Sequence, residues 1–197
     1  MEKFTIQSYS YNELGFEIRS EIAKFLDLVW PTTDPQALMP NEMPVSHRPE
    51  LSAQSFCCYD GNKMVGYAAI IYNEIVHCEN KFIMAGLSCV ATHPDYRSRG
   101  IGKKVVTVAT QYLASQNVVD FGIFTCHPNL ADFYRKAGNW QISPDIVLIG
   151  SHDNEALSSK NLNVVVMMRI FSEKAFANKN LFRSEPISLE FPAGEFI

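Results

Sequence analysis

The hydrophobic and polar positions of the chain change their spacing several times, and each change marks a predicted element. Residues 87–92 form an apolar, strand-like run that is followed by a turn at residues 93–95 and a basic, glycine-containing loop at residues 97–102. The apolar residues then recur at helical spacing, namely Ile101, Val105, Val108, Ala109, Tyr112 and Leu113. The order strand, glycine loop, helix is therefore the central feature of the sequence.

The same patterns predict the elements that precede this loop. Residues 4–9 alternate and predict a strand, and residues 14–30 carry one apolar helical stripe that stops at Pro31. Further strands are expected at the ranges 55–59, 64–78 and 82–92, with tight turns at Asp60-Gly61 and at residues 79–81. These strands form an antiparallel meander whose last member runs into the glycine loop.

Beyond the central helix, the patterns predict a strand at 118–126 and a helix that starts at Pro128-Asn129 and ends at Gly138. Two late strands are expected at the ranges 145–149 and 162–171. Residues 31–50 form a proline-rich excursion, and residues 173–197 form a C-terminal tail. With 197 residues, of which 47% are hydrophobic, the whole chain is expected to be one globular domain, 1–197.

The glycine loop has the chemistry of an anion site. The first turn of a helix presents backbone N–H groups without intrahelical partners, and Gly100 and Gly102 let the backbone approach a phosphate. Four basic side chains lie within eight residues of a chain whose net charge is −4: Arg97, Arg99, Lys103 and Lys104. A P-loop is excluded because Lys104 follows Lys103, and a dinucleotide fingerprint is excluded because Val105 stands where the third glycine belongs.

The loop resembles the coenzyme A loop of the GNAT superfamily of N-acetyltransferases, because Arg97, Gly100 and Gly102 match its pattern. A second stretch, 129–140, is similar to the family's pattern of Asn, Ala, Phe-Tyr, Lys and Gly followed by an aromatic, although the aromatic, Trp140, comes one place later. The resemblance covers about residues 4–171. It implies an α/β (α+β) GNAT fold with a mixed, mostly antiparallel sheet of about seven strands, helices on both faces and splayed central strands.

The resemblance implies acetyl-CoA as cosubstrate and no metal. Amides from Ser98 through Lys103 would hold the pyrophosphate, and the backbone N–H near Val90 would polarise the thioester. The implied cofactor-binding residues are Val90, Thr92, Arg97, Ser98, Arg99, Gly100, Ile101, Gly102, Lys103 and Asn129. Two plainer interpretations stay open: the loop is an ordinary strand-to-helix turn, and Asn129 is an N-cap.

Tyr134 matches the family's general acid, which protonates the departing thiolate; the alternative is a tyrosine of the core. The general base is not evident, because Ser88 stands at the position where one branch of the GNAT superfamily, the aminoglycoside 2′-N-acetyltransferases, carries a glutamate near the acceptor amine. Ser88 is expected to act through a water, or the Ile197 carboxylate or Glu195 supplies the base if the tail folds back. Cys89 lies mid-strand and is expected to fill the core rather than act as a nucleophile.

The long first helix, the late strands and the tail resemble the aminoglycoside 2′-N-acetyltransferase branch. We therefore expect acetyl transfer from acetyl-CoA, by direct attack, to a primary amine of a small, cationic acceptor. Candidate contacts of that cation are Asp34, Glu42, Glu190 and Glu195. Two alternatives stay open: acetylation of a protein or peptide, and a catalytically silent acyl-CoA-binding module, which the serine at position 88 favours.

Composition narrows the partners. The isoelectric point near 5.7 argues against nucleic acid, and no apolar run is long enough for a membrane span or a signal peptide. The five cysteines have no C-x-x-C spacing and the five histidines are scattered, so buried thiols are expected rather than disulfides or a metal site. A cytoplasmic monomer or homodimer is expected.

Overall fold

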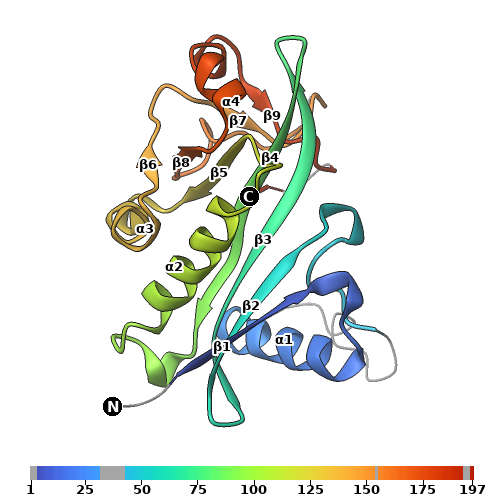
Figure 1. Ribbon diagram of the computed structural model, residues 1–197, viewed down its shortest axis with the longest axis vertical. Helices are drawn as coiled ribbons and strands as arrows, with labels where there is room; N and C mark the ends of the chain where they lie inside the picture. The colour runs from blue at the N-terminus through green and yellow to red at the C-terminus, as the bar shows by residue number, and fades with distance from the viewer. Residues whose placement is uncertain (1–3, 32–42, 154, 193–195) are drawn as a thin grey trace. The chain divides into compact units, whose positions relative to one another are not determined.

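The computed structural model describes residues 4–31, 43–153, 155–192 and 196–197, and its main feature is a mixed seven-stranded sheet (Figure 1). Strand β4 pairs with β5 in parallel, whereas the pairs β1–β2, β2–β3, β5–β8 and β6–β8 are antiparallel. The strands lie in the order β1 (Thr5–Ser10), β2 (Gln54–Asp60), β3 (Lys63–His77), β4 (Asn80–Thr92), β5 (Phe121–Cys126), β8 (Val165–Ile170) and β6 (Gln141–Ile142). The expected α/β fold class is thereby confirmed.

The chain divides into two compact units. The first unit comprises Met1–Ile71 and Ser88–Ala109, and the second comprises Tyr72–Leu87 and Thr110–Ile197. Strands β3 and β4 and helix α2 (Ile101–Ala114) contribute residues to both units. The single-domain organisation expected from the sequence stays a prediction.

In the first unit, helix α1 (Phe16–Val29) buries Ile22 and Phe25, two members of the predicted apolar stripe. The helix ends at its cap residue Trp30, since Pro31 cannot continue the hydrogen-bond ladder. Strand β3 approaches α2 so closely that a Cβ at Gly66 would lie 2.5 Å from Ile101 Cγ2. The short helices of this unit are η1 (Tyr11–Glu13), η3 (Pro49–Leu51) and η4 (Pro94–Tyr96).

Both predicted hairpin turns form. At the β2–β3 turn Gly61 adopts a φ of 59°, in the left-handed region that glycine tolerates best. The β3–β4 turn is shorter than residues 79–81, because β3 ends at His77 and β4 begins at Asn80. Its two residues, Cys78 and Glu79, have φ values of 47° and 64°, so two left-handed residues close the hairpin without a glycine.

In the second unit, an aromatic cluster joins β4, β5 and the C-terminal segment. The ring centroids of Phe121 and Phe182 lie 4.7 Å apart, and that of Phe82 lies 5.2 Å from Phe182. Beside this cluster, the Asp120 carboxylate accepts hydrogen bonds from the Ile83 N–H at 2.9 Å and the Ser172 hydroxyl at 2.7 Å. The remaining elements are η5 (Pro128–Leu130), α3 (Ala131–Gly138), β7 (Leu148–Ile149), α4 (Glu173–Ala177), η6 (Leu181–Arg183) and β9 (Ile187–Ser188).

The late strands differ from the prediction in one respect. Residues 145–149 do not join the large sheet: only Leu148–Ile149 is a strand, and it pairs in parallel with Ile187–Ser188 of the tail. The outer place in the large sheet is taken instead by β6 (Gln141–Ile142), which follows α3 directly. Both β6 and β9 are only two residues long, too short to produce an alternating pattern.

Among the described residues, no helix has the length and apolar character that crossing a membrane requires.

Candidate active site

The glycine loop leads directly into α2, as the sequence predicts. Ser98 and Gly100 have φ values of 64° and 78°, and these two left-handed residues turn the chain into the helix. The first α-helical bond after the loop runs from the Lys104 N–H to the Gly100 carbonyl, at 3.0 Å. The N–H groups of the first turn precede this bond and therefore point out of the helix end. The backbone thus presents donors where an anion would bind.

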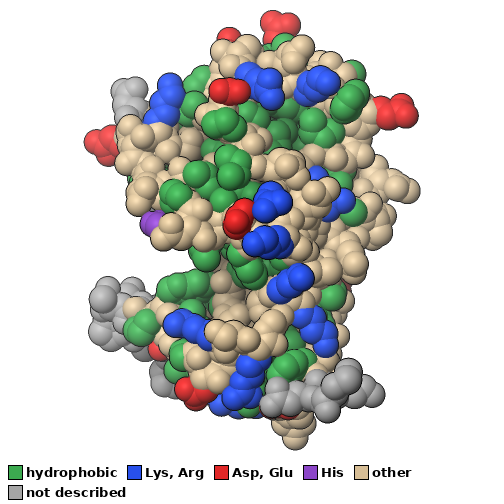
Figure 2. Space-filling view, turned by 90° about the vertical axis from the view of Figure 1, so that its left-hand side faces the viewer, with side chains coloured by type: hydrophobic (Ala, Val, Ile, Leu, Met, Phe, Trp, Pro, Cys, Tyr) green, Lys and Arg blue, Asp and Glu red, His purple; other side chains and the backbone are tan. Residues whose placement is uncertain are grey.

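The side chains of the loop divide into a buried anchor and an exposed basic rim. Ile101 is 1% exposed and packs against Gly66 of β3, whereas Arg97, Ser98, Arg99 and Lys103 are exposed. The Arg99 guanidinium lies 4.7 Å from the Tyr96 ring centroid, within cation–π range. In Figure 2, lysine and arginine side chains are visible at the surface on one face of the protein.

Lys104 differs from the other basic residues of the loop. Its ammonium donates a hydrogen bond to the Phe4 carbonyl and so joins the start of α2 to the chain just before β1. Lys104 therefore has a structural role here, whereas the sequence analysis groups it with the basic side chains of the predicted anion site.

His93 fixes the entry to the loop, a role that the sequence does not reveal. Its backbone N–H donates to the Val65 carbonyl of β3 at 3.0 Å, and its Nδ1 accepts from the Asp95 N–H at 3.2 Å. Its side chain is buried and its ring lies 5.4 Å from that of Tyr96, edge to face. From the sequence, His-Pro-Asp predicts only a turn. The hydrogen bond that the His93 side chain accepts from the N–H two residues later leaves no periodic pattern of apolar positions.

The end of β4 carries Ser88, which is predicted to handle the proton of the acceptor, and Val90 and Thr92, which are predicted to bind the cofactor. Ser88, Val90 and Thr92 are half-buried, and Cys89 between them has a φ of 50°, which breaks the regular strand conformation there. The Ser88 hydroxyl donates to Cys89 Sγ at 3.6 Å. Burial raises the pKa of the Cys89 thiol, so the sulfur stays protonated at neutral pH, as a core-filling cysteine would.

Tyr134 lies on α3, in the second unit, and is 8% exposed. Its ring packs edge to face against Phe124 of β5, with centroids 4.8 Å apart. Burial raises the pKa of its phenol, so the hydroxyl keeps its proton at neutral pH. Within the described part of the chain, we find no hydrogen-bond partner for this hydroxyl. Both the general acid and the core tyrosine are compatible with this position.

Asn129 does not cap a helix, contrary to the plainer interpretation of the sequence. It lies inside the 3₁₀ helix η5, whose N-cap is His127, and the His127 Nδ1 accepts from the Asn129 N–H at 3.3 Å. Helix α3 starts two residues later, with Leu130 as its N-cap. The Asn129 side chain is exposed at the end of β5, so its amide is accessible to a ligand.

Trp140 anchors the end of the second motif. It is fully buried, and its indole N–H donates to the Thr110 hydroxyl at 3.0 Å. A Cβ added at Gly122 would lie 2.5 Å from the Trp140 ring, and a Cβ added at Gly138 would lie 2.5 Å from the Thr110 hydroxyl. Both glycines therefore make room for this cluster. The extra residue before the aromatic is Asn139, which caps α3 with a left-handed φ of 55°.

The last residue of the tail occupies the space where β4 and β5 stop pairing. The described register between these strands contains only Met84–Phe121 and Ala85–Gly122. Beyond it, the Ile197 carbonyl accepts hydrogen bonds from the N–H of Thr125, at 3.1 Å, and from its hydroxyl. The Ile197 side chain covers Gly86, where any Cβ would collide with it. The tail therefore folds back onto β5.

Of the four predicted acceptor contacts, Glu190 lies among the described residues. Asp34, Glu42 and Glu195 lie outside the described residues. Glu190 is exposed and has a φ of 55°. Its carboxylate lies 3.4 Å from His152 Nε2, and the two side chains form an ion pair only when the imidazole is protonated. The loop and the end of β4 belong to the first unit, whereas Tyr134, Asn129 and Ile197 belong to the second.

Two comparisons of the sequence with known proteins bear on the family of the chain. The sequence model of the Acetyltransferase (GNAT) family matches residues 17–138. A search of curated proteins finds no match.

Solved structures of similar fold include acyl-CoA enzymes of several kinds. A GNAT family N-acetyltransferase of Escherichia coli in complex with CoA (YhbS) is 11% identical with a TM-score of 0.59, over 89% of this chain and 85% of that chain. The ribosomal-protein-S18-alanine N-acetyltransferase of E. coli is 13% identical with a TM-score of 0.51, over 86% and 95%. A probable N-acyltransferase of Enterococcus faecalis is 16% identical with a TM-score of 0.53, over 72% of this chain but only 33% of that longer chain.

At these identities the structural likeness establishes the fold alone, whereas the sequence match spans more than half of the chain and includes the glycine loop and Tyr134. The chain therefore belongs to the GNAT acetyltransferase family.

Proposed function

We propose that the protein transfers the acetyl group of acetyl-CoA to a primary amine of a small, cationic acceptor. The observation that carries this proposal is the loop at the start of α2, where two left-handed residues and a buried isoleucine anchor expose backbone N–H groups beside Arg97, Arg99 and Lys103. Such a helix end binds the pyrophosphate of a coenzyme, because its dipole and its donors both favour an anion.

The acetyl group is transferred in one direct step. The amine nitrogen attacks the thioester carbonyl carbon, a C–N bond forms and the C–S bond breaks. The backbone N–H near Val90 would polarise the carbonyl, and the Tyr134 hydroxyl would give its proton to the departing thiolate. Burial raises the pKa of this phenol, so the hydroxyl carries its proton at neutral pH, as a general acid must, but it is a weaker acid than a free tyrosine.

The proton of the acceptor ammonium needs a separate route. A serine hydroxyl is too weak a base to remove it alone, so we assign Ser88 to orienting a water that carries the proton away. The half-buried position of Ser88 at the irregular end of β4 supports this assignment. A small cationic acceptor is favoured by the acidic balance of the chain, with net charge −4.

The test is a turnover assay of acetyl-CoA against aminoglycosides, polyamines, amino acids and short peptides, with each acetylated product identified by mass spectrometry. Mass detection is preferred because it needs no thiol reagent, so the five free cysteines of the protein do not interfere with the readout. We expect turnover with a cationic small amine. Turnover confined to peptides would contradict a small cationic acceptor and favour acetylation of a protein or peptide. Tight acetyl-CoA binding without any product would favour the catalytically silent acyl-CoA-binding module.

A further inference from the structure

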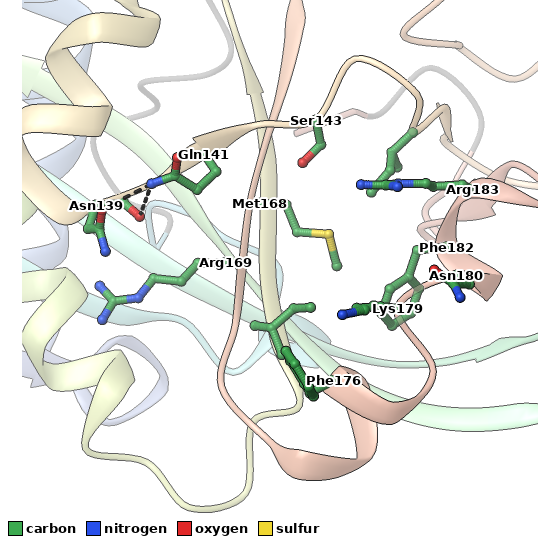
Figure 3. A pocket seen from close by; sticks show the side chains of 12 residues that line it. Asn139, Gln141, Ser143, Met168, Arg169, Phe176, Lys179, Asn180, Phe182 and Arg183 are labelled. Atoms are coloured by element: carbon green, nitrogen blue, oxygen red, sulfur yellow. Dashed lines mark hydrogen bonds between the residues drawn. The ribbon is translucent and has the colours of Figure 1, made fainter.

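A cavity of about 550 Å³ lies in the second unit, where β8 loses its outer neighbour (Figure 3). Strand β6 pairs with β8 only at Met167 and Met168, so no ladder covers the outer edge of β8 at Arg169 and Ile170. Helix α4 and the turn that follows it pass beside this edge and leave the cavity open to solvent. Its lining residues are Asn139, Gln141, Ser143, Ile146, Met168, Arg169, Ile170, Phe176, Lys179, Asn180, Phe182 and Arg183.

The charge of this cavity is opposite to that of the chain. Three of its lining side chains are basic, and among the described residues that line it none is Asp or Glu. Arg169 is engaged with the protein, because its Nη1 donates to the Gly138 carbonyl at 2.7 Å. The ammonium of Lys179 lies 4.3 Å from the Phe176 ring centroid, and no carboxylate neutralises it or Arg183 in the described structure.

Figure 3 shows that Lys179 and Arg183 extend from one side of the cavity toward Met168 and Ser143. The two cations are thus aimed at the same space, which the Ser143 hydroxyl also faces. The Gln141 amide points away from this space, because its N–H groups donate to the carbonyl and side-chain oxygens of Asn139, at 3.2 and 3.0 Å. Two neighbouring cations repel each other, and an anion between them removes that repulsion while accepting their hydrogen bonds. Arginine in particular matches the two-pronged geometry of a phosphate or carboxylate.

The rest of the cavity suits an apolar body attached to that anion. Its floor is formed by Met168 and Phe182, which are buried, and its rim includes Phe176, which is 61% exposed. A phenylalanine ring left this exposed beside a cation offers a face on which a flat ring can stack. The volume lies within the range of small-molecule sites.

We propose that this cavity binds a small organic anion, with a phosphate or carboxylate group between Lys179 and Arg183 and an aromatic body against Phe176. The site is independent of the acetyl transfer proposed above, because its lining residues include none of those assigned to the coenzyme or to catalysis.

The test is a titration of the full-length, isotope-labelled protein by NMR, with phenyl phosphate, benzoate, inorganic phosphate and benzyl alcohol as probes. We expect saturable binding of phenyl phosphate, with shifts at the amides of Ser143, Lys179 and Arg183, at least about tenfold tighter than that of inorganic phosphate. Comparison of phenyl phosphate with benzoate tells whether phosphate or carboxylate is preferred. Benzyl alcohol binding as tightly as the anions would overturn the proposal.

Charge reversal tests the two cations. The double variant Lys179→Glu/Arg183→Glu is expected to lose at least about tenfold in phenyl phosphate affinity, whereas Lys160→Glu, an exposed lysine outside the cavity, keeps the wild-type affinity. Phe176→Ala is expected to weaken phenyl phosphate but not inorganic phosphate. Equal affinities of the wild-type protein and the double variant would overturn the proposal.

A loop variant separates this site from the coenzyme loop, which is also expected to bind phosphate. Arg97→Glu is expected to leave the shifts at Ser143, Lys179 and Arg183 unchanged, because Arg97 does not line the cavity. Loss of those shifts in Arg97→Glu would contradict a separate site. Failure of the acetyl transfer assay would leave this result standing.

Discussion

Replacing Tyr134 with phenylalanine is expected to lower kcat about 100-fold, the scale of general acid catalysis, while the affinity for acetyl-CoA changes little. The substitution removes only the hydroxyl and keeps the ring that packs against Phe124. The thiolate must then leave without a proton, which slows the step in which the C–S bond breaks. The measurement is steady-state kinetics with the acceptor found in the turnover assay, together with calorimetric binding of acetyl-CoA.

A matched control makes the same chemical change elsewhere. Tyr9 lies on β1 and its hydroxyl donates to the Gln7 side chain, so Tyr9→Phe also removes one phenolic hydroxyl but is expected to keep wild-type kcat. An unchanged kcat in Tyr134→Phe would show that this residue is a tyrosine of the core. A loss of acetyl-CoA affinity as large as the loss of kcat would point to binding rather than proton donation.

Trp140→Ala is expected to destabilise the protein by about 3–5 kcal/mol, the usual cost of emptying a large aromatic site in a core. Trp140 is fully buried, donates to the Thr110 hydroxyl, and lies beside Phe124 with ring centroids 4.9 Å apart. The cavity left by alanine is bordered by Gly122 and Gly138, which have no side chains to fill it. The measurement is urea denaturation followed by far-UV circular dichroism, which does not depend on the missing indole.

Trp30 provides the control for this substitution. Its side chain is 52% exposed at the end of α1, so Trp30→Ala is expected to change the free energy of unfolding by less than about 0.5 kcal/mol. A loss below about 1 kcal/mol in Trp140→Ala would contradict the packing described for this cluster.

The helices and the long strands could be predicted from the sequence because each carries a full period of its pattern. The stripe of α1 and the apolar run of β4 span many residues. Strong stop signals also mark boundaries, since Pro31 follows the end of α1 and Gly61 separates β2 from β3. The face of α2 is wider than the predicted stripe: Ile101, Val105, Ala109 and Leu113 are buried, in agreement with the prediction, and Val106, which lies off the stripe, is fully buried as well. A helix that packs on more than one neighbour buries a wider face than a single stripe describes.

The short elements could not be predicted. Strands β6 and β9 have two residues each, and their pairing depends on where α3 and the tail place them rather than on local composition. The same holds for Ile197, whose contacts with Thr125 and Gly86 join residues far apart in the sequence. Such tertiary contacts leave no periodic signal along the chain.

The candidate site was predictable in its residue types but not in its geometry. The arginines and glycines of the loop are visible in the sequence, whereas the left-handed Ser98 and the supporting bonds of His93 are not, since neither residue type requires them. The cavity beside β8 was also not predictable, because Met168 and Arg169 come from that strand, whereas Lys179, Phe182 and Arg183 come from the tail.

Acetyl-CoA binding to the wild-type protein and to Gly100→Val, measured by calorimetry, tests the central claim most directly. Gly100 has a φ of 78°, which a β-branched residue strongly disfavours, and a Cβ there meets nothing within 4 Å, so valine disturbs the loop chiefly through its backbone conformation. Gly61→Val is the matched control, because Gly61 has a φ of 59° and equally open surroundings in the β2–β3 hairpin. If the loop holds the coenzyme, the wild-type protein and Gly61→Val bind acetyl-CoA alike, and Gly100→Val binds at least about tenfold more weakly. Equal binding by all three proteins, or no binding by the wild-type protein, would contradict the account.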